Sequence, residues 1–276
     1  MNVQNSSGKR WMPLAAGAAL LGAALVAAAR RKRTTGDQPY AYPPVDTLKP
    51  LADGLWIVDS GPISAMGLVM PVRMTVIRLD DGSLMLHSPT SCTAQLQAQL
   101  ADLGPVRHLV APSVGHWTFL AEWQSRYPDA ATWAVEGLKD RAQVRRAQVR
   151  IDGELGQVPP PEWEDAFELA TIAGGPFAEA CLFHKPTRTL LLADLIDNME
   201  PERLPPVTSL ALRLARATSA TTPLHVRGAL LLQRGQNRQV MDRLTQLRPD
   251  RVIFAHGQWF EDDAAERLIR AWSWLD

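Results

Sequence analysis

Three side chains that suit a metal ion each follow a short apolar stretch of the chain. His116 ends the stretch "HLVAPSVGH", Asp194 ends "TLLLAD" and His256 ends "RVIFAH". Apolar runs of this length are typical of buried strands, and functional side chains in layered α/β proteins gather in the loops where strands end. Two imidazoles and one carboxylate suit a single Zn²⁺ or Fe²⁺ ion with positions left open for water or substrate. The sequence therefore predicts a candidate metal site at His116, Asp194 and His256.

Each of these residues also has an ordinary structural interpretation. A single loop histidine can bond to the backbone, Asp194 could cap a following helix, and His256 with Gly257 could form a simple turn. A serine–histidine–aspartate triad could be assembled from Ser113, His116 and Asp194, but no GxSxG sequence surrounds the serine. Residue types alone leave these alternatives open.

The periodicity of apolar residues predicts the elements that carry these loops. Residues 74–79 and 84–87 alternate around an Asp-Asp-Gly turn and indicate a β-hairpin, after which Ser88-Pro89-Thr90 is expected to open a helix that ends near Leu103. A Gly- and Pro-rich loop is expected at 61–71 and a charged surface excursion at 136–161. Further strands are expected at 55–58, 106–111, 131–135, 167–172, 180–184, 189–193 and 251–255, and further helices at 117–127, 208–217, 226–247 and 262–274.

This order of elements predicts the fold class. Hairpins, then βα units, then hairpins and βα units again favour an α/β protein with two sheets face to face and helices outside, a four-layer αββα sandwich. No GxGxxG or Walker sequence follows any predicted strand, so the residues give no support for a nucleotide-binding Rossmann fold.

Longer stretches resemble the metallo-β-lactamase superfamily over about residues 50–276. The resemblance rests on "RMTVIRLDDGSLMLHSPT", "LVAPSVGHWTFLAEW", "LFHKPTRTLLLADLIDN" and the late "HG", which are similar to a little-characterised bacterial family, a domain of unknown function on that fold. It matches Asp194 to the bridging aspartate of the superfamily and His256 to its late histidine. His116 lies in the segment where the superfamily carries its HxHxDH motif.

The departures from that pattern limit what the resemblance implies. "PSVGHWT" stands where HxHxDH is expected, and "AGGPFAEA", residues 173–180, lacks the next expected histidine. A dinuclear site needs about five to seven protein ligands, and at most three remain here. The expected cofactor is therefore one zinc or iron ion, or none.

Four further residues are candidates for the lining of a pocket. His87 ends a predicted hairpin strand near the expected site, and Ser113 lies in the altered motif. Arg73 and Glu122 lie in segments that match the narrower family, although pairing at the surface or at the edge of the core is the commoner role for such residues.

The N-terminal segment predicts a membrane anchor. Residues 11–29 carry no charge, and as a helix they would extend about 28 Å, close to the thickness of the hydrocarbon core of a bilayer. The alternative is a cleaved signal peptide, but the cluster Arg30–Arg33 directly after the apolar run opposes translocation. We expect a single-pass protein of the bacterial inner membrane with its body in the cytoplasm, the periplasm being the alternative.

Charge and cysteine content exclude other classes. The net charge of zero combines +5 in residues 1–38 with −5 in the remainder, and this mildly acidic body gives no reason to expect nucleic-acid binding. Cys92 and Cys181 lack metal-knuckle spacing and are expected to be free thiols. With 46% apolar residues the chain can bury one large core.

The expected domain division follows from these features. It comprises a tail at 1–10, the anchor at 11–29, a basic stop and extended Pro-rich linker at 30–50, and a metallo-β-lactamase-like domain at 51–276. The leading functional hypothesis is a mononuclear metal-dependent hydrolase acting on an unknown small molecule. The alternatives are a metal-free binding or scaffold module with a protein partner and, third, a mononuclear iron redox enzyme.

Overall fold

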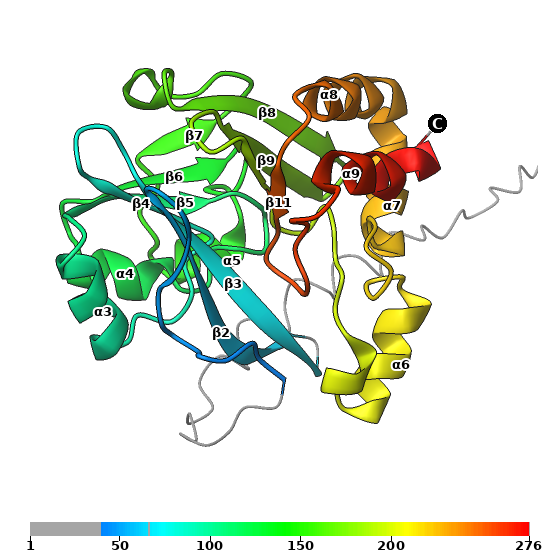
Figure 1. Cartoon of the computed structure of the whole chain (residues 1–276), viewed down its shortest axis with the longest axis horizontal. Coiled ribbons are helices and arrows are strands. Elements are labelled where there is room, and N and C mark those ends of the chain that lie inside the picture. The colour runs from blue at the N-terminus through cyan, green and yellow to red at the C-terminus, as the bar shows by residue number, and fades with distance from the viewer. Residues whose placement is uncertain (1–39, 66, 276) are drawn as a thin grey trace, which may run out of the picture.

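The computed structural model describes residues 40–65 and 67–275. Its strands form two sheets, each made of strands that are consecutive in the chain, in the order β1-β2-β3-β4-β5-β6-β7 for the first sheet and β11-β10-β9-β8 for the second. The two sheets lie between layers of helices (Figure 1). This is the αββα arrangement that the order of elements predicted.

The first sheet combines an antiparallel half with a parallel half. The pairs from β1 to β4 are antiparallel, and those from β4 to β7 are parallel. The strands of this sheet are β1 (Lys49–Ala52), β2 (Leu55–Ala65), β3 (Leu68–Arg78), β4 (Leu84–His87), β5 (Val106–Ala111), β6 (Ala131–Val135) and β7 (Gly153–Leu155).

The second sheet alternates its side chains between two environments. Leu169, Leu182 and Ile253 face the first sheet, while their chain neighbours Cys181 and Val252 face the helices on the other side. This period of two is what a strand buried on both faces requires. The strands of this sheet are β8 (Phe167–Gly174), β9 (Phe177–His184), β10 (Thr189–Leu191) and β11 (Arg251–Ile253).

The helices form the two outer layers. On the first sheet Leu96, Leu120 and Trp123 are fully buried, and on the second Met241 and Leu268 are almost fully buried. The α-helices are α3 (Ala94–Ala101), α4 (Leu120–Arg126), α5 (Ala142–Arg146), α6 (Pro206–Leu214), α7 (Leu224–Leu230), α8 (Arg234–Gln246) and α9 (Ala264–Trp272). Short 3₁₀ turns are η1 (Pro161–Trp163), η2 (Pro201–Arg203), η3 (Leu231–Gln233) and η4 (Ser273–Leu275).

Two expected irregular segments are ordered parts of the body. The linker predicted at 30–50 is packed on the body at two places that the structure describes, because Ala41 is fully buried and Lys49 and Pro50 belong to β1, which pairs with β2. The loop expected at 61–71 is instead a β-ribbon in which β2 and β3 continue to pair beyond a bulge between Ser60 and Ile63. Gly61 and Pro62, two of the residues that suggested a loop, are accommodated at that bulge.

The expected excursion at 136–161 contains α5 and β7, the edge strand of the first sheet. Among the described residues no helix is long and apolar enough to cross a membrane. The predicted anchor at 11–29 lies outside the described residues.

Candidate metal centre

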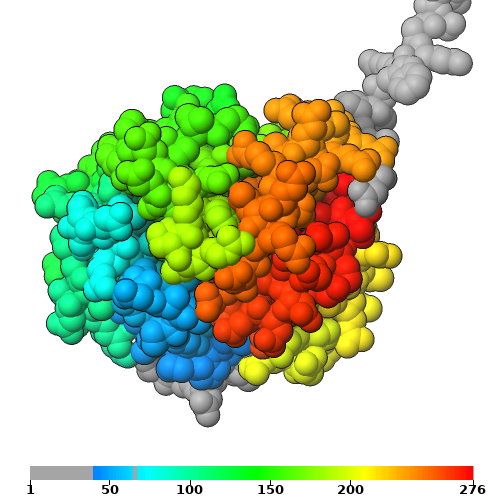
Figure 2. All heavy atoms as spheres, turned by 45° about the horizontal axis from the view of Figure 1, so that its top comes forward, coloured from blue at the N-terminus to red at the C-terminus, as the bar shows by residue number. Residues whose placement is uncertain are grey.

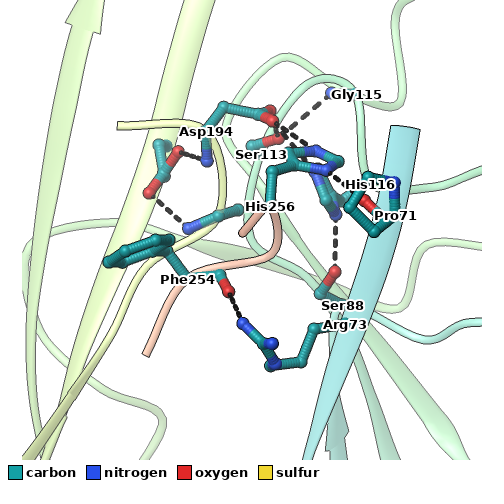
Figure 3. A network of polar contacts seen from close by, with 11 residues as sticks. Pro71, Arg73, Ser88, Ser113, Gly115, His116, Asp194, Phe254 and His256 are labelled. Carbon is teal, nitrogen blue, oxygen red and sulfur yellow. Dashed lines mark hydrogen bonds and ion pairs between the residues drawn. The ribbon is translucent and has the colours of Figure 1, made fainter. Parts of the chain in front are cut away.

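The three predicted metal ligands meet at one edge of the sandwich. His116 follows β5, Asp194 follows β10 and His256 follows β11, so the ends of strands from both sheets contribute. Nε2 of His116 lies 3.0 Å from Oδ1 of Asp194, and Nε2 of His256 lies 3.4 Å from the same oxygen (Figure 3). One donor atom from each residue lies within 4.8 Å of the others.

The outer nitrogen of His256 is fixed by a backbone carbonyl. Its Nδ1 lies 2.8 Å from the carbonyl oxygen of Pro71, the first buried residue of β3. Because a carbonyl oxygen only accepts, Nδ1 must carry the proton. In a neutral His256, Nε2 would therefore be a hydrogen-bond acceptor. It would then face Oδ1 of Asp194, which is also an acceptor. A proton or a metal cation between them turns this repulsion into attraction.

The outer nitrogen of His116 is fixed by a hydroxyl group. Ser88 Oγ lies 2.5 Å from His116 Nδ1. Ser88 directly follows β4 with a φ of 58°, a left-handed conformation that serine rarely adopts, and it is buried. The expectation that Ser88-Pro89-Thr90 opens a helix is wrong, since α3 begins later and its N-cap is Thr93, whose Oγ1 accepts from Leu96 N.

The carboxylate of Asp194 is held from a second side as well. Ser113 Oγ donates to Oδ2 of Asp194 and in turn accepts from the backbone N of Gly115 at 3.2 Å. Burial alone would raise the pKa of Asp194, but His116 and His256 outweigh it and hold this pKa well below its usual range. Asp194 is therefore an anionic donor at neutral pH. Ser113 binds the aspartate rather than His116, so the triad assembled from the sequence does not form in that order.

Glu179 is a site residue that sequence reasoning missed. It is fully buried on β9, and its two oxygens accept from the backbone N of Ala193 and of Asp194, each at 2.7 Å. Burial and the nearby Asp194 charge raise the pKa of Glu179 to about 8, against the opposing effect of the backbone donors. It lies in the segment 173–180 where a histidine was expected, and a carboxylate at that place was the available signal.

Two buried groups border the cluster without joining it. His87 ends β4, and burial followed by the charge of His116 lowers its pKa to about 3, so its ring is neutral. Asp197 follows Asp194 by three residues and was missed as well. Burial raises the pKa of Asp197 to about 8, although the charge of His256 acts to lower it. Because the pKa of His87 is about 3 and that of Asp197 is about 8, both side chains are uncharged at neutral and mildly acidic pH.

The structure places the other two pocket candidates differently. Arg73 is buried and pairs with Asp59 at 2.7 Å, and it donates to the carbonyl oxygens of Phe254 and Gly257 at 3.1 and 2.7 Å. Arg73 thus connects β3 to the loop that carries His256, and it stabilises that loop without being one of the three donors. Glu122 is exposed on α4, where its charge acts on Cys92, and the structure does not bring it to the cluster.

The donor set fits one small cation. Both imidazoles present Nε2 inward while their outer nitrogens have protein partners, the arrangement that metal-binding histidines require. A tetrahedral zinc ion with ligands at about 2.0–2.2 Å has neighbouring donors roughly 3.3–3.5 Å apart, close to the two separations from Asp194. Gly115 leaves room beside them, since a Cβ there would lie 3.3 Å from Asp194 Oδ2. The role of the three residues as ligands stays a prediction.

Solved structures with this fold are similar over most of the chain. The DIM-1 metallo-beta-lactamase superposes with a TM-score of 0.56 at 10% identity, covering 83% of this chain and 98% of the other. A metallo-beta-lactamase from Pontibacter korlensis gives 0.54 at 12% identity, with coverage of 82% and 97%. The metal-soaked Flv1 flavodiiron core from Synechocystis sp. PCC6803 gives 0.58 at 12% identity, with coverage of 83% and 60%. At these identities the likeness shows the fold alone.

The fold is thus that of the metallo-β-lactamases, as the resemblance implied. None of the curated proteins matches the chain significantly. A family model does match, over residues 53–271, which is most of the described body. The chain therefore belongs to the family described as "Domain of unknown function (DUF4336)", on the metallo-β-lactamase fold.

Proposed function

We propose that this protein is a mononuclear metal-dependent hydrolase, with His116, Asp194 and His256 as the ligands and a small molecule as the substrate. The observation that carries the proposal is the inward Nε2 of His256. Its Nδ1 is committed to the Pro71 carbonyl, so Nε2 is the nitrogen that faces the Asp194 carboxylate, at 3.4 Å. A divalent cation between these donors satisfies all of them at once.

The residues of the chain hold the donors ready for such an ion. Pro71 and Ser88 fix the orientation of the two imidazole rings, and Glu179 fixes the backbone at Asp194 through two amide groups. Ser113 occupies the second oxygen of Asp194 and leaves Oδ1 to the histidines. When bound, the ion would act as a Lewis acid and lower the pKa of a water molecule to near neutrality.

Elemental analysis of the purified full chain tests the proposal. We expect about one equivalent of zinc per chain, lost in a His256→Ala variant and kept in a His108→Gln control. The ring of His108 lies edge-on against Trp163, outside the cluster. Circular dichroism of each variant checks that the fold is intact. Metal-free native protein, after growth with zinc and iron supplied, would overturn the proposal.

One observation favours a second function, a metal-free binding module. Both oxygens of Asp194 already have protein partners, and a doubly protonated His256 would also satisfy the acceptor facing it. The elemental analysis separates the two functions, because this module would hold no metal in any growth medium. Iron in place of zinc would instead redirect the search to redox substrates, since the same donor set suits Fe²⁺.

We further propose that residues 11–29 anchor the body to the inner leaflet of the bacterial inner membrane. The uncharged run and the cationic cluster Arg30–Arg33 after it support this orientation. Membrane fractions washed with alkaline carbonate should retain the full chain. Protease added outside spheroplasts should leave the body intact, and cleavage there would place it in the periplasm instead.

A further inference from the structure

Helix α6 exposes an apolar stripe that the fold does not use. Its side chains Val207, Leu210 and Leu214 are 79%, 61% and 71% exposed. These positions follow one another at spacings of three and four residues, so they share one face of the helix. Thr208 and Leu212 on another face are buried.

The buried face of α6 already has its partner within the body. Leu212 packs in a small cluster with Met199 and Leu204, against which Leu68 and Met70 of the β2–β3 ribbon also pack. The exposed stripe is therefore an additional apolar surface. In Figure 1 α6 lies at the margin of the body, apart from α8 and α9, and in Figure 2 the yellow part of the chain is at the rim of the surface.

A further exposed leucine lies near the end of α6. The backbone N of Leu224 donates to the carbonyl oxygen of Ala215 at 2.9 Å, which brings the start of α7 to the end of α6. Leu224 is itself 47% exposed. We call Val207, Leu210, Leu214 and Leu224 together the α6 patch. Exposed apolar side chains gathered in this way are typical of an interaction site.

The position where the described chain begins indicates what covers the α6 patch. The ring of Tyr42 lies 5.1 Å from the guanidinium of Arg203, and Arg203 precedes the first residue of α6 by three positions. The chain therefore enters the body beside the N-terminus of α6. The 13 residues from Ala29 to Tyr42 reach at most about 45 Å when fully extended, so the proposed anchor holds Tyr42, and the start of α6 beside it, within about that distance of the bilayer.

The charges around the α6 patch suit a lipid surface. Arg213 and Arg216 are exposed near the end of α6, and neither makes an ion pair with any residue that the structure describes. Arg203 is already neutralised by Glu200 at 2.8 Å. An apolar stripe flanked by unpaired arginines is the pattern of a helix that lies in the interface of an anionic membrane.

We propose that the α6 patch docks on the acyl-chain boundary of the membrane that holds the anchor, with Arg213 and Arg216 at the lipid headgroups. This inference rests on the proposed anchor and is independent of the metal. It gives the body a fixed orientation on the bilayer. A second copy of this chain, or residues 11–29 folded back on α6, are the competing occupants.

Spin labels in the full chain test the proposal. A nitroxide is attached at Leu210→Cys, in a background where the buried Cys92 and Cys181 are replaced by alanine, and the protein is placed in vesicles of neutral and anionic phospholipid. The matched control is Ile269→Cys on α9, which is also exposed and apolar. We expect the label at 210 to collide with oxygen several-fold more often than with a water-soluble nickel complex, and the label at 269 to show the opposite.

Each other result has a definite meaning. Equal exposure to nickel at 210 and 269, in protein that resists carbonate extraction, overturns the docking surface and leaves the anchor. Protein released by carbonate overturns the anchor itself. Dipolar broadening between labels at 210 identifies a second copy, and a label at 210 that is shielded in detergent as well identifies residues 11–29, so either overturns the proposal. A label at Leu214→Cys repeats the measurement if the first variant does not fold.

Discussion

The hydroxyl oxygen of Ser88 lies 2.5 Å from Nδ1 of His116. This contact joins the end of β4 to the turn after β5 and sets which nitrogen of the imidazole faces Asp194. A ring without such a partner can rotate about χ2 and present either nitrogen, so the contact determines the geometry of the site more than its composition does.

Replacing Ser88 with alanine should therefore weaken metal binding without abolishing it. We expect the affinity for zinc to fall about 10–100-fold, the usual effect of losing the partner of a metal-bound histidine. Competition with a chromophoric chelator measures the change. Ser91→Ala, at a half-buried position in the same loop, is the control and should bind as the native protein does. Equal affinity in Ser88→Ala would show that packing alone orients His116.

Gly257 should not tolerate a side chain. Its φ is 95°, and a Cβ there would lie 2.1 Å from the carbonyl oxygen of Asn198. Gly257→Ala must move the loop that carries His256, so we expect loss of bound metal together with a fall of more than about 2 kcal/mol in the free energy of unfolding. Urea denaturation and elemental analysis measure the two effects.

Gly235 gives the matched control for that substitution. It lies in α8 with nothing within 4 Å of the added Cβ, and Gly235→Ala should raise the free energy of unfolding by about 0.5–1 kcal/mol. If Gly257→Ala keeps native stability and metal, the close approach of Gly257 to Asn198 is not required.

Arg73 should contribute to stability through its buried ion pair. Arg73→Met leaves Asp59 buried with only Lys49, at 2.8 Å, as an ionic partner, and the carbonyls of Phe254 and Gly257 lose their donor. We expect a loss of about 3 kcal/mol in the free energy of unfolding, the lower part of the range for breaking a buried pair. Urea denaturation measures the loss.

An exposed ion pair serves as the comparison for Arg73. Arg78 pairs with Asp53, which is almost fully exposed, so Arg78→Met should change stability little. The double variant Arg73→Met, Asp59→Asn should recover part of the loss because no buried charge remains unpaired. A double variant as unstable as the sum of its single changes would refute the ion-pair explanation.

His87 should make the protein less stable in acid. Burial lowers its folded pKa to about 3, whereas the unfolded chain titrates near 6.5, so between these values only the unfolded state binds the proton. The free energy of unfolding is therefore undiminished above pH 6.5 and falls by up to about 1.4 kcal/mol per pH unit as the pH decreases toward 3.

A His87→Leu variant removes this contribution. Its stability relative to the native protein should rise steadily from pH 6.5 to pH 4.5 in urea titrations. His184, whose pKa burial lowers to about 4, is present in both proteins and cancels in the difference. Parallel losses of stability in the two proteins would assign the acid sensitivity to other groups.

The strands that could be predicted from the sequence are those whose apolar residues follow a local repeat. The alternation of apolar residues in β8 and β9 and the apolar runs before His116, Asp194 and His256 identified strands because each side chain's environment repeats every two residues. Strand-end positions then brought the three donors together, since strands of both sheets end at the same edge.

The unpredicted part depends on contacts between distant residues. Ser88 resembled a helix cap because a Ser-Pro-Thr sequence commonly begins helices, and its partner His116 lies 28 residues away. Glu179 gave no local signal for its bonds to the amides at 193 and 194. Gly61 and Pro62 suggested a loop because turn propensity does not reveal that a partner strand continues beside them.

Each sheet is built from an unbroken length of chain, the first from residues 49–155 and the second from residues 167–253. His116 belongs to the first length, and Asp194 and His256 belong to the second. A chain cut between β7 and β8 would therefore yield two fragments, neither with the full donor set, and the site would reappear only on their complementation. Association of the fragments would raise the affinity for a ligand that is held by all three donors. By thermodynamic linkage, that ligand would raise the affinity of the fragments for each other by the same factor. A metal ion bound at the candidate centre would thus strengthen the association of the two halves of the molecule.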